Sequence, residues 1–293
     1  MATSIRMPVG YFVMAPLGQG HLVKDEVLSN PNVAGMVLRQ RWSEFNPALD
    51  KFDFSYLESQ FIRIRKFKKK IILSIYTGTC SPLWLQKPPH KVPFYDGAPY
   101  PWDNTMHDLH SYMVQALGDH FNSDPSLVAV ELSGPTFDSN ELHSAPGLTR
   151  RLGYSVGKMT DAWETCIDQY ARYFPSCGLL SCGGISGQGS KGPVTRSVFD
   201  YLLKEYPKQG VVSHCALKAS TTPTAMHHTL VSEYSKKGLY AGFEMVGPSI
   251  DSKQGRPVSR FGGKFSTAIA LGKKANARFF KYYMADTKFI KLP

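Results

Sequence analysis

The residues best suited to chemistry are glutamates at the ends of apolar runs. Glu244 ends the run Tyr240-Ala-Gly-Phe-Glu, and Glu141 follows Asn140 after the run Leu127–Leu132. A carboxylate is costly to bury among apolar side chains, so we expect Glu244 to face an opening in the fold. Two carboxyl groups that face each other can act as an acid/base pair, in which one donates a proton while the other attacks or activates water.

The glutamates belong to a regular alternation of apolar runs and amphipathic segments. Eight runs are typical of strands: 9–15, 33–38, 70–76, 127–132, 178–182, 210–214, 239–244 and 277–283. Seven segments between them are typical of helices, near 21–29, 54–69, 105–121, 156–173, 194–206, 222–237 and 262–274. This order predicts an α/β fold, a single (β/α)8 TIM barrel over residues 1–293, with the ends of strands four and seven across the mouth from each other.

Two long segments follow the third and fourth predicted strands. Residues 86–102 are rich in proline and aromatic side chains, and residues 134–151 include Glu141. Loops of this length inside a compact domain are usually functional. We expect the two segments to wall one side of the barrel mouth.

The acid/base partner of Glu244 has two candidates. Glu141 lies nine residues beyond Leu132, whereas Glu131 lies inside the strand-like run. The alternation of side chains directs Glu131 to the face opposite Leu132, which is expected to be the barrel interior. Glu131 is therefore either the alternative acid/base or a buried structural glutamate paired with Arg39.

Basic residues offer a second set of alternatives. Arg39, at the end of the second predicted strand, has a planar guanidinium that can bind a catalytic carboxylate and lower its pKa. For Glu244 the structural alternative to catalysis is an ion pair with Lys218 or another base that faces the mouth.

The chain resembles the clan A superfamily of TIM-barrel glycoside hydrolases, in particular its β-galactosidase-like and cellulase-like members. The resemblance covers most of the chain and is carried by Gly35-Met-Val-Leu-Arg39, Trp42, Pro47, Phe52–Leu57, Lys70–Leu73, Gly78, Pro82, Trp84 and Leu85. In that superfamily the acid/base is a glutamate after strand four, often preceded by asparagine, and the nucleophile is a glutamate ending strand seven. Asn140-Glu141 and Glu244 match those positions.

The resemblance implies an enzyme that cleaves O-glycosidic bonds with retention, without a metal or cofactor. Glu244 would attack the anomeric carbon while Glu141 protonates the leaving oxygen, and the two carboxyl groups would lie about 5–5.5 Å apart.

A carbohydrate substrate also needs binding residues around the mouth. Aromatic faces can pack against pyranose rings, and a histidine can bind a sugar hydroxyl. The candidates are Trp42, Tyr76, Trp84 and Trp102 after strands two and three, and His214 at the end of strand six.

Composition narrows the class of protein. The five cysteines are widely spread without a CxxC pair, which indicates reduced thiols and neither disulfides nor a zinc site. The net charge of +11 is able to attract a polyanion. Its densest cluster, Arg63–Lys70, ends a predicted helix, where cations complement the helix dipole, so nucleic acid is an unlikely partner.

No apolar run approaches the roughly 18 residues of a membrane span. The first residues lack the order of a secretory signal, so the chain as written is expected to be cytoplasmic, or secreted or periplasmic if it has been trimmed.

Two other functions fit the same barrel. Lys218, near the end of strand six, is a candidate Schiff-base nucleophile of an aldolase-like lyase. A catalytically impaired barrel that binds a glycan or an anionic polymer is also compatible, because barrels host many functions.

Overall fold

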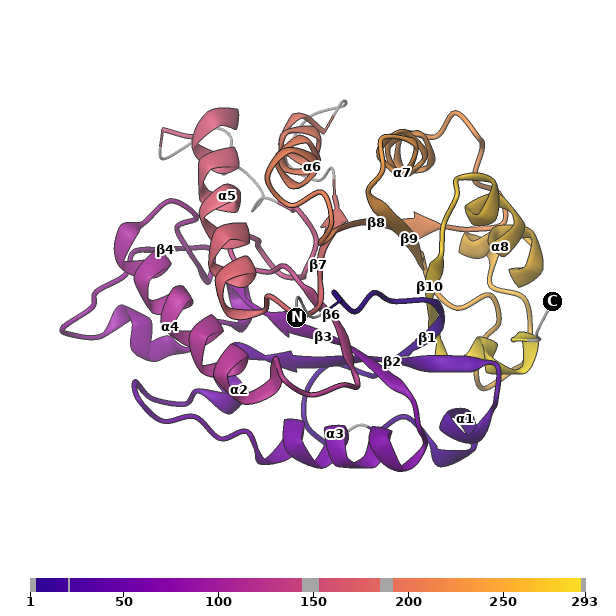
Figure 1. Cartoon of the computed structure of the whole chain (residues 1–293), viewed down its shortest axis with the longest axis horizontal. Helices are drawn as coiled ribbons and strands as arrows, with labels where there is room; N and C mark the ends of the chain where they lie inside the picture. Colours follow the sequence, from indigo (N-terminus) through magenta and orange to yellow (C-terminus); the bar gives the residue numbers. More distant parts are fainter. Residues whose placement is uncertain (1–3, 21, 144–152, 185–191, 291–293) are drawn as a thin grey trace.

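Eight parallel strands close into a barrel in the hydrogen-bonded order β1-β10-β9-β8-β7-β6-β3-β2 (Figure 1). The computed structural model describes residues 4–20, 22–143, 153–184 and 192–290. The strands are β1 (Gly10–Met14), β2 (Val33–Arg41), β3 (Lys70–Tyr76), β6 (Leu127–Glu131), β7 (Gly178–Gly183), β8 (Gly210–Leu217), β9 (Tyr240–Met245) and β10 (Phe279–Tyr283). The predicted (β/α)8 barrel is confirmed.

Helices surround this barrel (Figure 1). They are α1 (Asp25–Ser29), α2 (Trp42–Phe45), α3 (Ser55–Lys66), α4 (Asn104–Phe121), α5 (Val156–Tyr173), α6 (Pro193–Glu205), α7 (Met226–Lys236) and α8 (Phe265–Lys274). Short 3-10 turns are η1 (Gly78–Cys80), η2 (Leu83–Gln86), η4 (Ser259–Phe261) and η5 (Met284–Phe289), and η5 follows β10. Each of the seven predicted segments contains a helix, whereas the four-residue α2 was not predicted.

Strand pairing explains why β2 is longer than its sequence pattern. The predicted strand stops at Leu38, but Arg39 pairs in register with Ser74 and Arg41 with Tyr76. Backbone pairing with β3 therefore continues through polar residues that a hydrophobicity pattern alone would leave out of the strand. As a result Arg39 lies within the strand, two residues before its end.

Capping residues set two helix starts. Asp103 accepts a hydrogen bond from the Met106 N–H at 2.8 Å and caps α4. Ser155 accepts from the Lys158 N–H at 3.1 Å and caps α5. Both bonds satisfy an N–H group that the first helical turn leaves free.

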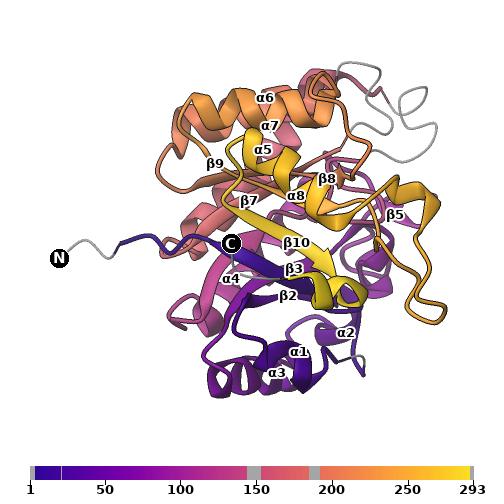
Figure 2. The same cartoon turned by 90° about the vertical axis from the view of Figure 1, so that its right-hand side faces the viewer.

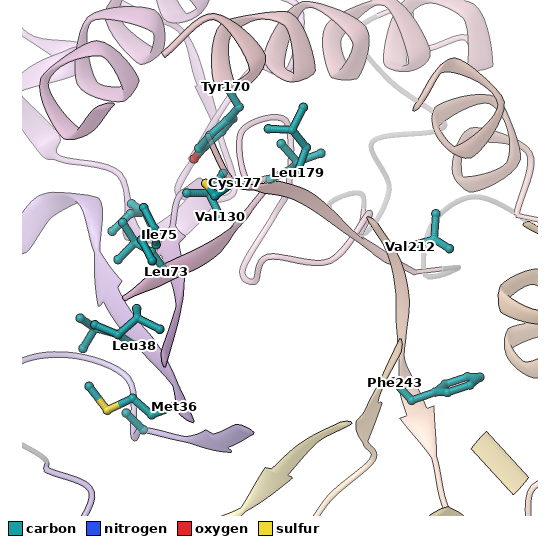
Figure 3. Close-up of a cluster of buried hydrophobic side chains, with 14 of the residues drawn as sticks. Met36, Leu38, Leu73, Ile75, Val130, Tyr170, Cys177, Leu179, Val212 and Phe243 are labelled. Atoms are coloured by element: carbon teal, nitrogen blue, oxygen red, sulfur yellow. The ribbon is translucent and has the colours of Figure 1, made fainter. Parts of the chain in front are cut away.

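Two apolar layers hold the barrel together. Outward-facing strand residues pack beneath the helices, as Figure 3 shows for Met36, Leu38, Leu73, Ile75, Val130, Leu179, Val212 and Phe243. A second cluster inside the barrel includes Phe12, Val37, Ile72, Leu180 and Phe279. The inner positions nearer the carboxyl ends of the strands are charged instead, with Glu131 and Lys281 fully buried.

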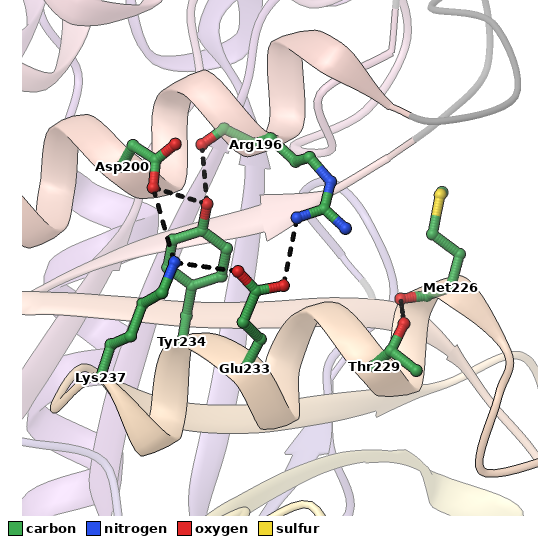
Figure 4. Close-up of polar contacts among 7 residues, drawn as sticks. All are labelled: Arg196, Asp200, Met226, Thr229, Glu233, Tyr234 and Lys237. Carbon is green, nitrogen blue, oxygen red and sulfur yellow. Dashed lines mark hydrogen bonds and ion pairs between the residues drawn. The ribbon is translucent and has the colours of Figure 1, made fainter.

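Polar contacts join α6 to α7 on the outside of the barrel (Figure 4). The Tyr234 hydroxyl donates to Asp200 at 2.8 Å, and Glu233 accepts from Arg196 at 3.1 Å and from Lys237 at 2.9 Å. These contacts fix α7, whose amino-terminal end lies at the mouth.

The segment 86–102 contains η2 and the hairpin strands β4 (Phe94–Tyr95) and β5 (Ala98–Pro99). Figure 2 shows β5 at the end of the molecule toward which β10 points. Tyr95 and Tyr100 share a small cavity with Phe137 and His143 of the segment that follows β6. Residues 144–151 of the second predicted loop lie outside the described residues. No described helix combines the length and apolar character that crossing a bilayer requires.

Gly78 shows how closely the loops after β3 and β6 approach. Its φ is +61°, and a Cβ atom there would lie 2.0 Å from the Phe137 carbonyl oxygen. The Thr79 N–H donates to that same oxygen at 2.7 Å. A glycine is therefore required for both conformation and space.

We expect Gly78→Ala to lower the free energy of unfolding by about 1–3 kcal/mol, because the methyl group must displace the chain that carries Glu141. Urea unfolding measures this loss. Gly255→Ala is the matched control, since Gly255 has a φ of +66° but no described atom within 4 Å of its Cβ position. Equal losses in the two variants would contradict the proposed contact.

Candidate active site

A cavity of about 400 Å³ lies at the carboxyl ends of the strands, the size of many small-ligand sites. It is lined by side chains from β8, β9, β10, the start of α7, η4 and the segment after β6. They are Glu141, His143, His214, Cys215, Ala216, Met226, His227, Glu244, Val246, Arg260 and Tyr283. The cavity therefore brings both predicted catalytic glutamates to one place.

Glu141 reaches the cavity because the fourth barrel strand is interrupted and then resumes. Glu131 pairs with Leu180 of β7, and Glu141 pairs with Cys182. The two glutamates are ten residues apart, whereas their partners are only two apart. Glu141 thus occupies the position two residues beyond Glu131 on a continued strand, which turns both side chains to the same inner face.

Hydrogen bonds hold the intervening excursion, which we call the β6 loop (residues 132–143). The Thr136 hydroxyl donates to the Glu141 carbonyl oxygen at 2.7 Å, and the His143 N–H donates to the same oxygen at 2.7 Å. Ser139 accepts from the Glu141 N–H at 3.1 Å. The backbone of Glu141 is therefore fixed at both its N–H and its carbonyl group.

The Glu141 carboxylate is paired with a histidine. Its Oε2 lies 2.9 Å from Nε2 of His143, and the two side chains are 17% and 25% exposed. Burial by itself raises the pKa of Glu141, but hydrogen bonds from His143 and Cys215 outweigh it, and the pKa lies below its ordinary value. Burial opposes charge on His143 too, yet Glu141 raises the pKa of His143 above its ordinary value.

Glu244 has a different partner. Lys281 lies beside Glu244 in the β9–β10 register, and its Nζ is 2.7 Å from the Glu244 carboxylate. The same ammonium group contacts Glu131, and both of those side chains are fully buried. One lysine is therefore shared by two carboxylates inside the barrel.

Burial dominates the protonation of this cluster. It raises the pKa of Glu244, with Lys281 opposing the rise and the carboxylates of Glu131 and Glu141 adding to it. For Lys281, burial acts against the charge, but Glu131 and Glu244 raise its pKa well above the ordinary value. Lys281 is consequently an ammonium group at any physiological pH.

The predicted pairing of Glu131 with Arg39 is wrong, because Lys281 binds Glu131. Glu244 also pairs with Lys281, so its basic partner is another mouth-facing base and not Lys218. The Arg39 Nε donates to the Ala15 carbonyl at 2.6 Å. Lys281 can reach Glu244 because it lies beside Glu244 in the strand register and on the inner face of β10.

Arg39 and Tyr76 lie beside the carboxylates of Glu244 and Glu131. The Arg39 Nη1 approaches the Tyr76 hydroxyl at 3.4 Å. Burial raises the pKa of Tyr76, and Glu244 and Glu131 are near enough to contribute to that rise. Arg39 thus holds Tyr76 at the edge of the charged layer.

His214 is buried in the wall of the cavity with neither ring nitrogen hydrogen-bonded to any described residue. Its ring lies 5.3 Å from that of His227. Burial lowers the pKa of His214 to about 3, and His227 adds to the effect. The imidazole is therefore neutral and offers one donor and one acceptor to a ligand.

The predicted aromatic platforms are not at this cavity. Trp42 is fully buried and donates to Asn46 Oδ1 at 2.9 Å, so it is a core residue. Trp84 packs edge-on against Trp42, and Trp102 packs against Tyr154. Among the described residues, the aromatic ring that lines the cavity wall besides the histidines is Tyr283.

Comparison with known proteins gives the fold. No family model matches the sequence, and no curated protein is similar to it. The structure is similar to β-galactosidase from Bacillus circulans sp. alkalophilus, with a TM-score of 0.62 and 12% identity over 97% of this chain. It is also similar to xylanase XynB from Paenibacillus barcinonensis, with a TM-score of 0.60 and 9% identity over 94% of this chain. A third similar structure is xylanase B from Clostridium stercorarium F9, with a TM-score of 0.56 and 14% identity over 95% of this chain.

The chain has the fold of the TIM-barrel glycoside hydrolases. It covers 84% of the Paenibacillus xylanase and 86% of the Clostridium xylanase, but only 51% of the β-galactosidase. The resemblance read from the sequence is therefore confirmed at the level of the (β/α)8 barrel fold.

Sequence reasoning did not assign Lys281 and His143 as the partners of the two glutamates. Lys281 interrupts the apolar strand Phe279–Tyr283, the same signal that singled out Glu244. His143 follows Glu141 by two residues, a spacing that carried no information until the β6 loop was seen to place both at the cavity.

Linkage between protonation and folding gives the Glu141–His143 pair a defined pH window. Glu141, with a pKa below 4.5, contributes stability above pH 4.5 that is lost as the pH falls through its lowered pKa. His143, with a pKa above 6.5, contributes stability below pH 6.5 that is lost as the pH rises through its raised pKa. The contribution is therefore greatest between these two values.

We expect His143→Gln to lower the free energy of unfolding by about 1 kcal/mol near pH 5.5, and by less near pH 9. Urea unfolding at both pH values tests this. His120→Gln is the control, because His120 forms an exposed ion pair with Glu58 at 2.7 Å and should change stability by no more than about 0.5 kcal/mol. A loss for His143→Gln that does not depend on pH would contradict the ion pair.

Proposed function

We propose that this protein hydrolyses O-glycosidic bonds with retention of the anomeric configuration, with Glu244 as nucleophile and Glu141 as acid/base. The observation that carries the proposal is that both glutamates line one cavity at the carboxyl end of a glycosidase-like barrel. They come from the fourth and seventh barrel strands. They are also near enough to interact electrostatically, since Glu141 contributes to the raised pKa of Glu244.

In the first step a Glu244 carboxylate oxygen attacks the anomeric carbon. The bond between that carbon and the leaving oxygen breaks, and the leaving oxygen takes a proton from Glu141. A covalent glycosyl ester on Glu244 results. Lys281, 2.7 Å from the Glu244 carboxylate, supports the ionised form that this attack needs.

In the second step Glu141, now a carboxylate, accepts a proton from water as the water oxygen attacks the anomeric carbon. The ester bond to Glu244 breaks, and the sugar leaves with its original configuration. Both residues return to their starting protonation states.

The two glutamates have different partners, since Glu244 contacts the Lys281 ammonium group and Glu141 pairs with the titratable His143. Activity requires Glu244 to be ionised, so the acid limb of the pH profile follows its raised pKa. Activity also requires one proton on the Glu141–His143 pair, which the raised pKa of His143 retains to higher pH. The proposal therefore predicts a bell-shaped profile whose limbs belong to separate groups.

Glu244→Gln and Glu141→Gln should each reduce kcat by at least about 10²–10⁴-fold on natural glycosides, because each removes an essential group. A panel of natural oligosaccharides and aryl glycosides measures the loss. Added azide should restore turnover and form a glycosyl azide of inverted configuration with Glu244→Gly and of retained configuration with Glu141→Gly. Proton NMR of the sugar first released by the parent enzyme should show the same anomeric configuration as the substrate.

Two results would reject this function. Hydrolysis with inversion would remove the nucleophile role from Glu244. Glycan binding that survives Glu244→Gln, with no hydrolysis by the parent protein across the panel, would identify a non-catalytic glycan-binding barrel.

His214 is the proposed contact to a substrate hydroxyl. A buried imidazole without a partner is costly, and a sugar hydroxyl would satisfy it. We expect His214→Phe to reduce kcat/KM by roughly 10–100-fold while leaving the free energy of unfolding unchanged or higher.

Substrates that lack one hydroxyl group identify the contact. The deoxy substrate missing the bound hydroxyl should lose activity with the parent protein but little more with His214→Phe. His228→Phe is the control in a neighbouring buried histidine, whose Nε2 is already bound to the Leu271 carbonyl at 3.0 Å. If every deoxy substrate responds alike in both proteins, His214 does not bind a hydroxyl.

A further inference from the structure

We propose that Lys281 is a positioning residue that holds Glu244 in its ionised form, and that Glu131 links this contact to the β6 loop carrying Glu141. This inference rests on the proposed function and assigns two residues that the reaction steps themselves do not use.

A continuous chain of buried polar contacts crosses the barrel. Asn140 donates from Nδ2 to one carboxylate oxygen of Glu131, and Lys281 donates to the other. Lys281 also contacts Glu244. Asn140 directly precedes Glu141 in the chain, so the order of contacts is Asn140, Glu131, Lys281, Glu244. The two proposed catalytic carboxylates are therefore held relative to each other through one buried network.

Glu131 is placed for this role and not for proton transfer. Its side chain is fully buried, both of its carboxylate oxygens already accept hydrogen bonds, and it is absent from the described cavity lining. An acid/base must reach the leaving oxygen directly or through one water. Glu141, which lines the cavity, satisfies that condition.

The charge of the cluster explains why one lysine serves two carboxylates. Glu131, Lys281 and Glu244 together carry a net charge of −1 when all are ionised. Without the ammonium group, two carboxylates would share a buried site, and one of them would take up a proton. Other ionisable groups face this cluster from the surrounding elements: Arg39 on β2, Tyr76 on β3, Glu141 after β6, Cys182 on β7, Cys215 on β8 and Tyr283 on β10.

Two substitutions should move the acid limb of the kcat/KM profile in opposite directions. Lys281→Met leaves Glu244 facing Glu131, so the limb should move up by about one pH unit or more, which is a tenfold loss of kcat/KM per unit on that limb. Glu131→Gln leaves Lys281 to Glu244 alone, so the limb should move down. The acid limb of the double variant should lie at a lower pH than that of Lys281→Met, because the Glu131 carboxylate that repels Glu244 is gone.

Opposite shifts separate positioning from structural damage, since misfolding lowers activity without moving a limb in two directions. The basic limb, which belongs to the Glu141–His143 pair, serves as an internal reference. Lys69→Met is the matched control: Lys69 is partly buried at the other end of the barrel and donates to the Asn30 and Val33 carbonyls at 2.9 and 2.6 Å. It should leave the acid limb unchanged.

A titration of the Glu244 carboxyl carbon by ¹³C NMR decides the matter without activity, with the signal assigned by its loss in Glu244→Gln. Should Lys281→Met not fold, Glu131→Gln alone tests the direction. An unmoved Glu244 titration and acid limb in both variants, with Glu244→Gln inactive, would overturn the role of Lys281 and leave the proposed function standing. An active Glu244→Gln would overturn the function, while the NMR titration would still report on Lys281.

Discussion

A lysine buried between two carboxylates controls the upper layer of this barrel. Charges cost several kcal/mol each to remove from water, and they persist inside a protein only when their partners are well placed. Lys281 meets Glu131 on one side and Glu244 on the other, while apolar side chains such as Ile72 and Leu180 fill the barrel below. The apolar layer makes the fold stable, and the charged layer places two carboxylates on one ammonium group next to the cavity. In the proposed reaction this layer would lie beside the electron-poor anomeric carbon.

The interruption of the fourth strand brings the second carboxylate to this layer. β6 ends at Glu131, and the chain leaves the sheet and returns to it at Glu141. The excursion is held by neighbouring elements: the Ser133 carbonyl accepts from Cys166 of α5 at 3.1 Å and lies 2.8 Å from Nε2 of His110 on α4. A loop so constrained positions a side chain nearly as well as a strand does, which is the condition for a productive geometry at a reacting centre.

The barrel was predictable because its signal is local and repeated, as eight apolar runs separated by amphipathic helices leave few alternative topologies. Glu244 was predictable for a related reason, since a carboxylate in an apolar strand stands out. The ionic partners of the glutamates were not predictable in this way. Arg39 and Lys281 both lie on inner strand faces, and only the register of β10 against β9 shows which of them meets Glu244. Trp42 stands after a strand like a binding-site residue, yet its indole is buried on Asn46. Sequence spacing also places Glu141 too far from the strand, because the strand resumes after an excursion that no periodicity in the sequence reveals.

The partners of the two glutamates differ in one respect that bears directly on their roles. Lys281 keeps its proton throughout the physiological range because the carboxylates of Glu131 and Glu244 raise its pKa against the effect of burial, so it can stabilise charge on Glu244 but cannot exchange protons with it. Glu141 raises the pKa of His143 above its ordinary value, so a single proton can lie on either member of the Glu141–His143 pair. A nucleophile benefits from a fixed cation, whereas an acid/base that must give up a proton and recover it in each turnover benefits from a partner that can hold one. The two partners therefore support the proposed roles of Glu244 as attacking group and Glu141 as proton donor, whereas the raised pKa of Glu244 and the lowered pKa of Glu141 taken alone favour the reverse assignment.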